Sequence, residues 1–288
     1  MTDEITNVFS VDVEDYFQVT AFEREVRRDQ WHTFESRVAD NTRRLLDMLA
    51  RHRVRGTFFL LGWVAQRCGV LVREIHAAGH ELASHGFWHR LVYQQTPEEF
   101  RQDLRDSRAA LEDAAGVEVT AYRAPSFSIT KQSLWALEVL AEEGFQVDSS
   151  IFPVRHDRYG IPGAADALHQ LHTAAGPLWE FPPSVVRLGG VNWPVSGGGY
   201  FRLYPLALSA AALERINRRR RAFMFYIHPW EVDPQQPWLS AGSRLSRFRH
   251  RVNLASTERK LERLLTRFRF GTLGEAIAAS QCAQAVPA

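Results

Sequence analysis

The stretch "FSVDVEDYFQV", Phe9–Val19, places three carboxylates at the end of an apolar run. Its first residues alternate between apolar and polar side chains, which is typical of a β-strand. Asp12, Glu14 and Asp15 then fall within four positions. Like charges so close together repel one another, so this end of the strand either faces open solvent or is compensated by another charge. The stretch therefore predicts a first strand that ends in a polar cluster.

Short apolar runs and amphipathic helical patterns alternate along the rest of the chain. "RGTFFLLG" and "ELASH" are typical of strands, and "NTRRLLDMLARHRV" is typical of a helix. Thr96 is an expected N-cap, because Pro97 and two acids follow it at the start of another helical pattern. Alternation of this kind predicts an α/β fold with a mostly parallel sheet, open or closed into a barrel. In such folds the polar residues at the carboxyl ends of the strands form the site.

Composition narrows the class of protein. The 288 residues, 45% of them hydrophobic, suffice for one large domain or two small ones. A net charge of +2 gives no strong attraction for nucleic acid. Cys68 and Cys282 are the only cysteines, which argues against a disulfide framework and for a reducing compartment. No signal-peptide pattern opens the sequence, and no apolar run approaches the roughly 18 residues of a membrane span. We therefore expect a cytoplasmic protein without a transmembrane segment or a nucleic-acid partner.

Further polar residues follow the later apolar runs. His85 and His89 are four positions apart, so on a helical turn they would face one side and could share a metal ion. Such a pair alone is more often structural. The acidic cluster changes this weighting, because a divalent cation would offset its repulsion and two imidazoles with a carboxylate form a hydrolytic zinc set. The other polar residues at such positions are Arg123, Asp148 and His228.

Five motifs give the chain a resemblance to a known family. "SVDVED", "SHGFWH", "YRAP", "VDSSI" and "YIHP" occur in the order seen in the polysaccharide deacetylases, the NodB-homology or carbohydrate esterase family 4 group. The resemblance implies a distorted (β/α)7 barrel and a metal-dependent hydrolase that removes acetyl groups from N-acetylated sugars. "GGGYFRLYP" and "HPWEVDP" are similar to a subgroup found beside exosortase-linked exopolysaccharide genes. We accordingly expect one domain over residues 1–288, with a subgroup-specific C-terminal extension at about 236–288.

The resemblance also implies catalytic roles for four residues. Asp12 matches the catalytic base, and Arg123 matches the arginine that orients this base. His228 matches the general acid, and Asp148 matches the carboxylate that tunes this histidine.

One divalent metal ion, with zinc as the expected metal, is implied in the same way. His85 and His89 match the metal-binding histidines. The carboxylate ligand stays open between Glu14, which strand alternation puts on the face of Asp12, and Asp15, which preserves the residue type of the family.

An N-acetylated saccharide is the expected substrate, as N-acetylhexosamine units of an exopolysaccharide or its precursor. A lipid-linked precursor would bring the protein to a membrane surface. One alternative is hydrolysis of another C–N bond, such as a cyclic amide of the allantoin type, for which a small closed pocket is expected. Another is a non-catalytic sugar-binding module, which would have lost the base or a metal histidine. The expected substrate-binding residues, for which core packing is the competing interpretation, are Trp88, Pro125, Trp193, Tyr200 and Trp230.

Overall fold

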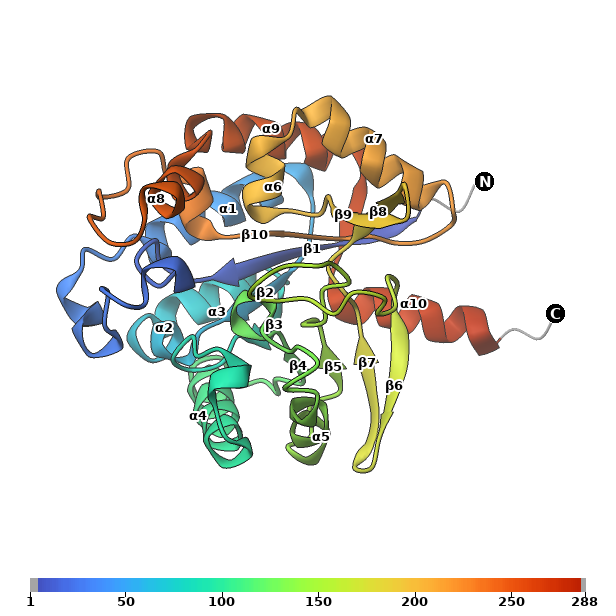
Figure 1. Cartoon of the computed structure of the whole chain (residues 1–288), viewed down its shortest axis with the longest axis horizontal. Helices are drawn as coiled ribbons and strands as arrows, with labels where there is room; N and C mark the ends of the chain where they lie inside the picture. The colour runs from blue at the N-terminus through green and yellow to red at the C-terminus, as the bar shows by residue number, and fades with distance from the viewer. Residues whose placement is uncertain (1–4, 286–288) are drawn as a thin grey trace.

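The computed structural model describes residues 5–285 and is organised around one nine-stranded sheet (Figure 1). Within this part of the chain, seven strands run parallel in the order β10-β1-β2-β3-β4-β5-β7, β6 pairs antiparallel with β7, and β11 pairs with β1. The strands are β1 (Thr6–Val13), β2 (Thr57–Leu60), β3 (Glu81–Ser84), β4 (Ala121–Tyr122), β5 (Val147–Asp148), β6 (His169–Thr173), β7 (Gly176–Glu180), β10 (Met224–Ile227) and β11 (Arg269–Gly271). The predicted α/β fold with a parallel sheet, the architecture of a distorted (β/α)7 barrel, is confirmed.

Within residues 5–285, β10 and β6 end the sheet without pairing with each other, and the chain after β7 forms a separate two-stranded hairpin. This hairpin is formed by β8 (Val185–Leu188) and β9 (Val191–Pro194). Just after it, Gly197 makes a parallel bridge with Tyr226 on the free edge of β10.

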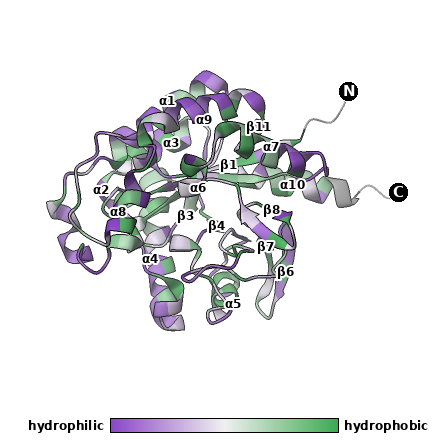
Figure 2. Ribbon diagram, turned by 45° about the horizontal axis from the view of Figure 1, so that its top comes forward, coloured by the Kyte–Doolittle hydropathy of each residue, from purple (hydrophilic) through white to green (hydrophobic). Residues whose placement is uncertain are grey.

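Helices connect the strands and cover the outer face of the sheet (Figure 1). The predicted helix after Thr96 is present as α4, and a capping box between Thr96 and Glu99 begins it. Figure 2 shows apolar residues along the central strands, polar residues on the edge strand β6 and mixed polarity on the helices. The helices are α1 (Val38–His52), α2 (Gly62–Arg67), α3 (Gly69–Ala77), α4 (Pro97–Ala115), α5 (Trp135–Glu142), α6 (Gly198–Leu203), α7 (Leu206–Asn217), α8 (Arg244–Arg251), α9 (Leu254–Arg267) and α10 (Leu273–Ala285).

Strand β1 is buried on both faces, and its alternation positions the site. Phe9 packs outward against the helices and contacts the Phe225 and Phe270 rings, at centroid distances of 5.8 and 5.6 Å. Val8 belongs to the inner apolar cluster, which also contains residues of β2 and β10. Because side chains alternate along a strand, Asp12 points to the same inner side as Val8.

Residues from the C-terminal part of the chain complete the sheet around β1. β10 pairs with one edge of β1, and β11 shares the other edge with β2. Residues 268–276 form β11 and the start of α10. The division into one domain with an extension stays a prediction. No helix within residues 5–285 is long and apolar enough to cross a bilayer.

Candidate functional site

The three acids that end the first strand lie in three different environments. Asp12 accepts a hydrogen bond from Arg123, 2.6 Å from its Oδ1 to Nη1. Glu14 lies beside His89, with 2.7 Å between its Oε2 and Nε2 of the histidine. Asp15 turns away and accepts hydrogen bonds from the residues that begin α1, at 2.8 to 3.2 Å. The three acids are therefore held apart by different partners, and burial raises the pKa of Asp15 to about 6 despite its hydrogen bonds.

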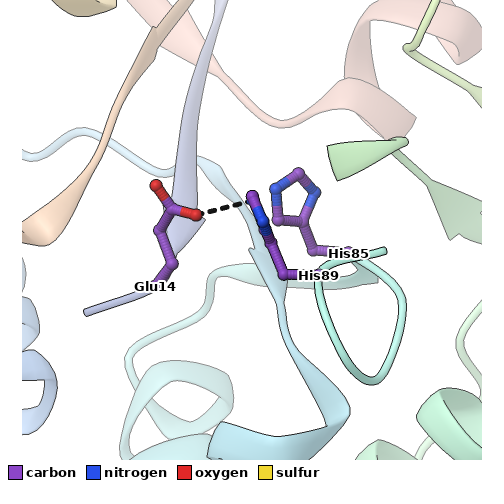
Figure 3. A group of neighbouring side chains, drawn as sticks. All are labelled: Glu14, His85 and His89. Atoms are coloured by element: carbon purple, nitrogen blue, oxygen red, sulfur yellow. Dashed lines mark ion pairs between the residues drawn. The ribbon is translucent and has the colours of Figure 1, made fainter. Parts of the chain in front are cut away.

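A candidate metal centre is formed by Glu14, His85 and His89 (Figure 3). One ligand atom from each residue can be chosen so that all three atoms lie within 4.8 Å of one another. All three side chains are buried. Burial alone would raise the pKa of Glu14, but His89, His228 and His85 lower it to about 2. Burial lowers the pKa of His85 to about 4. A carboxylate and a neutral imidazole are the protonation states that metal ligation requires.

These donors fit a divalent cation. Nδ1 of His85 lies 2.8 Å from the carbonyl oxygen of Arg123, which fixes the proton on this nitrogen and leaves Nε2 free to bind a metal. Glu14 Oε2 is buried, and the nitrogen beside it is Nε2 of His89, at 2.7 Å. A cation between this oxygen and the imidazole nitrogens would satisfy all of them. Of the two carboxylates left open by the sequence, only Glu14 lies in this group, because Asp15 is held at the start of α1.

The two histidines are brought together by a loop and not by the helical turn that their spacing suggested. Residues 85–90 are non-helical, and His89 has a left-handed φ of 50°. Gly86 has a φ of 72°, and a Cβ there would lie 2.7 Å from Asp103 Oδ2. Asp103, on α4, accepts hydrogen bonds from the backbone N–H groups of residues 87 and 88 at 2.8 and 3.3 Å. Backbone strain of this kind is common at functional sites.

Arg123 is fully buried and fixes the position of Asp12. Its guanidinium also donates to Ser10 Oγ and to Ser149 Oγ, both at 2.9 Å. Its Cζ atom lies 4.0 Å from the centre of the Phe59 ring. These contacts hold the guanidinium in place, so Asp12 presents Oδ1 to Arg123, while its Oδ2 lies 3.9 Å from Nε2 of His228.

His228 follows β10 and faces the same mouth. Its Nε2 lies 3.9 Å from Asp12 Oδ2 and 3.6 Å from Glu14 Oε1. Its Nδ1 lies 2.7 Å from Glu231 Oε1, and Glu231 in turn pairs with the buried Arg202 at 2.6 Å. Burial lowers the pKa of His228, but the hydrogen bond to Glu231 and the charges of Glu14, Glu231 and Asp12 raise it to about 9.

The expectation that Asp148 tunes His228 is corrected, because the structure gives that position to Glu231. Asp148 is fully buried and accepts a hydrogen bond from Ser150 Oγ. The same Ser150 Oγ accepts a hydrogen bond from the backbone N–H of Ala124 at 2.8 Å. It also contacts Glu180, its register partner on β7, and burial raises the pKa of both carboxyls. Asp148 therefore supports the strand ends that carry Arg123.

Trp230 is buried and not an open platform for a sugar. Its Nε1 donates to Glu14 Oε1 at 3.2 Å, and its ring stacks between His228 and His250 at centroid distances of 5.2 and 4.3 Å. These contacts indicate that Trp230 positions Glu14 and His228.

The other residues expected to contact substrate have varied surroundings. Trp88 packs against Phe87 and lies near Trp31, and Pro125 is buried. Tyr200 lies 3.2 Å from Tyr159, hydroxyl to hydroxyl. Trp193 is 49% exposed on β9. Substrate contact by these four residues stays a prediction.

Two buried residues of the site, Glu231 and Arg202, escaped the sequence interpretation. Glu231 could have been found locally, because the sequence His-Pro-Trp-Glu forms a single 3-10 turn, η5 (Pro229–Val232), that returns the acid to the histidine. Arg202 has no such local pattern, since it lies 29 residues before Glu231 in the sequence.

Comparisons with known proteins identify the family and the fold. Residues 24–146 match the family model described as polysaccharide deacetylase, and residues 149–278 match a domain of unknown function, DUF3473. The candidate polysaccharide deacetylase YheN of Bacillus subtilis is 32% identical over 136 residues, 44% of this chain and 47% of that protein. The peptidoglycan-N-acetylglucosamine deacetylase PgdA of Listeria monocytogenes is 39% identical over 90 residues, 31% of this chain and 19% of that protein. The chain thus spans less than half the length of these relatives.

Solved structures share the fold. A candidate polysaccharide deacetylase from Mycobacterium smegmatis superimposes with a TM-score of 0.64 and 20% identity, over 100% of this chain and 95% of the other. The peptidoglycan deacetylase PdaC of Bacillus subtilis gives a TM-score of 0.52 and 12% identity, over 98% and 95%. The family match over residues 24–146, the curated relatives and the five motifs show that this chain carries a polysaccharide deacetylase domain of the NodB-homology, carbohydrate esterase family 4 type.

Proposed function

We propose that this protein is a metal-dependent hydrolase that removes N-acetyl groups from N-acetylhexosamine units of an exopolysaccharide or its lipid-linked precursor. One observation carries the proposal: His228, which is paired with Glu231, lies 3.6 Å from Glu14 of the candidate metal-ligand group and 3.9 Å from Asp12, which Arg123 orients. Relatives described as peptidoglycan-N-acetylglucosamine deacetylase and chitooligosaccharide deacetylase support the chemistry.

A divalent ion held by Glu14, His85 and His89 would act as a Lewis acid and lower the pKa of a water molecule to about 7. Two imidazoles and one carboxylate suit zinc, which is the metal we propose. Asp12 would accept the proton of the attacking water through Oδ2, because Arg123 occupies Oδ1.

The leaving amine requires a proton, because an amide anion is a poor leaving group. His228 would supply it from Nε2, which faces Asp12 and Glu14 across the mouth. Glu231 holds the opposite ring nitrogen and favours the charged imidazole, while Arg202 keeps Glu231 ionised.

The proposal is tested by metal content and acetate release. The purified protein should contain about one zinc ion per chain and release acetate from short N-acetylglucosamine oligomers or lipid-linked N-acetylhexosamines. His85→Ala should lose both properties. Allantoin serves as the comparison substrate, and activity on it without acetate release would replace the proposal with cyclic-amide hydrolysis. Full metal content in His85→Ala would refute the metal site. We also propose a cytoplasmic location, which cell fractionation would test.

A further inference from the structure

A patch of exposed apolar side chains and arginines lies on and just before α8. Trp238, Leu245 and Phe248 are 65%, 55% and 59% exposed. The sequence from Pro234 to Thr257 contains no aspartate or glutamate. No ion pair within residues 5–285 joins the arginines of this segment to a carboxylate. The set, here called the α8 patch, is Trp238, Arg244, Leu245, Arg247, Phe248, Arg249 and Arg251.

The geometry of the helix separates these side chains into faces. At 100° per residue, Leu245 and Phe248 project to one side, and His250 projects to the opposite side. His250 is buried against Trp230, with 4.3 Å between ring centroids, so the opposite face carrying Leu245 and Phe248 points outward. Arg244 and Arg249 flank the two apolar side chains, one on each side. The outer face of α8 therefore has an apolar centre with a basic border.

The patch is firmly attached, so its apolar side chains are not free to turn inward. Arg202 donates hydrogen bonds to the carbonyl oxygens of residues 249, 250 and 252 at 2.8 to 3.0 Å. Ser243 caps the helix by accepting from the backbone N–H of Ser246 at 3.0 Å. Gly242, with a φ of 73°, packs on the Phe22 ring, where a Cβ would lie 2.8 Å from a ring carbon. A fixed apolar surface of this kind is a mark of an interaction site.

We propose that the α8 patch binds the surface of an anionic lipid bilayer. Trp238, Leu245 and Phe248 would enter the boundary between headgroups and acyl chains, as the apolar face of an interfacial helix does. The flanking arginines would reach lipid phosphates while their stems stay in apolar surroundings. Anionic lipid is favoured over a dissolved polyanion, because a polyanion would pair with the arginines and leave Leu245 and Phe248 in water.

The patch lies next to the candidate active site. His250 on the inner face of α8 stacks on Trp230, and Trp230 donates to Glu14, a candidate metal ligand. Figure 1 shows α8 at the end of the molecule to which the arrow of β1 points, the end where Asp12 and Glu14 lie. Bilayer binding would hold the mouth close to a lipid-linked sugar. The role of bilayer binding in presenting a lipid-linked sugar rests on the proposed function, whereas bilayer binding itself does not.

Vesicle co-sedimentation tests the inference with the full chain. The protein should bind vesicles of phosphatidylcholine with phosphatidylglycerol, and bind phosphatidylcholine alone more weakly. Leu245→Ser with Phe248→Ser should lower the partition coefficient by about tenfold or more. Arg244→Gln with Arg249→Gln should lower it by about fivefold for each arginine. Thermal melts should stay unchanged, because these side chains are exposed.

Matched controls lie elsewhere on the surface. Leu188→Ser with Leu208→Ser removes two leucines that are 51% and 56% exposed, and Arg218→Gln with Arg219→Gln removes two exposed arginines. Both control proteins should bind vesicles like the original. The inference fails if the original protein ignores anionic vesicles, or if the controls lose as much binding as the patch variants.

Two further readouts separate the remaining interpretations. Leu245→Ser with Phe248→Ser should release acetate from short oligomers at the original rate. If the original protein binds anionic vesicles but releases no acetate, only the proposed function is overturned. Retained acetate release without vesicle binding by the original protein would overturn only the present inference. Equal binding of the original and the serine variant to vesicles would show that the apolar side chains take no part and would also refute it.

Discussion

Replacing Glu231 with glutamine is expected to lower the pKa of His228 and so to remove its proton at a lower pH. The carboxylate lies 2.7 Å from Nδ1 of the histidine, on the ring nitrogen that faces away from the candidate metal ligands. Its influence should therefore persist whether or not Glu14 binds a metal. Glutamine keeps the size of the side chain and an acceptor oxygen but removes the charge.

The structure gives the scale of the effect. The pKa of His228 rises from 6.5 to about 9, and Glu231 provides both a hydrogen bond and a charge toward this rise, against the opposing effect of burial. The rise corresponds to about 3 kcal/mol in favour of the imidazolium. Loss of the Glu231 charge should remove at least about one pH unit of it. Because deprotonated His228 cannot donate, the alkaline limb of activity should move to lower pH by that amount.

The assay is acetate release over a range of pH, with Asp148→Asn as the control. Both variants alter a fully buried acid near the end of a strand, but only Glu231 contacts His228. Glu231→Gln should also cost about 3 kcal/mol of stability, because Arg202 then stays buried without a counter-charge. Urea unfolding measures this cost and confirms that the variant is folded during the assay. An alkaline limb that moves in Asp148→Asn and stays in place in Glu231→Gln would refute the assignment.

Three further predictions concern single residues. Glu14→Gln should lose metal by elemental analysis. Asp15→Asn should keep its metal and instead lose about 1–3 kcal/mol of unfolding free energy, because its hydrogen bonds hold the start of α1. Equal metal loss in both variants would contradict the assignment of the two acids to different environments. Asp12→Asn should keep its metal and lose on the order of 10²–10⁴ in turnover, and near-original turnover would exclude it as the base. Burial lowers the pKa of His80 from 6.5 to about 4, so the unfolded chain binds this proton first and stability should fall as pH drops through that range. His80→Gln should reduce that acid-side loss by up to about 3 kcal/mol in urea unfolding, and an unchanged loss would argue against it.

The sequence predicted the fold because strand and helix periodicity are local, whereas the site residues were implied by the order of the five motifs. Alternation along β1 correctly puts Asp12 and Glu14 on one face. It cannot show that Asp15 meets the start of α1, because that contact forms only after the helix packs on the strand. The spacing of His85 and His89 alone indicates a helical turn, because it does not reveal the support that Asp103 gives to the loop between them.

The partner of His228 was missed for a related reason. Asp148 ends a strand in the order that the motifs prescribe, but its place beside Glu180 depends on the pairing of β5 with β7. Glu231 lies only three residues from the histidine, so the local turn contained the answer. A buried acid close in sequence to a functional histidine is therefore worth weighing against a distant one supplied by a motif.

The segment that matches a domain of unknown function supplies one side of the candidate site. His228, Glu231 and Arg202 all lie within residues 149–278, whereas His85 and His89 of the candidate metal centre lie within residues 24–146. The register pairs Val11 with Ile227, so the residues that follow, Asp12 and His228, emerge beside each other. The free edge of β10 is then held by Gly197, from the same C-terminal segment.

Gly197→Ala tests whether this edge contact positions His228. Gly197 has a φ of 145°, and a Cβ would overlap the carbonyl oxygen of Tyr226 and lie 2.8 Å from its carbonyl carbon. Gly163, with a φ of 86° and no atom within 4 Å of a Cβ, is the control. Gly163→Ala should cost about 1 kcal/mol from its backbone conformation alone. Gly197→Ala should cost about 3 kcal/mol or more in urea unfolding and lower acetate release while metal content stays high, because Glu14, His85 and His89 lie on other strands and loops. If Gly197→Ala matches Gly163→Ala in both stability and turnover, the bridge to β10 does not position the histidine.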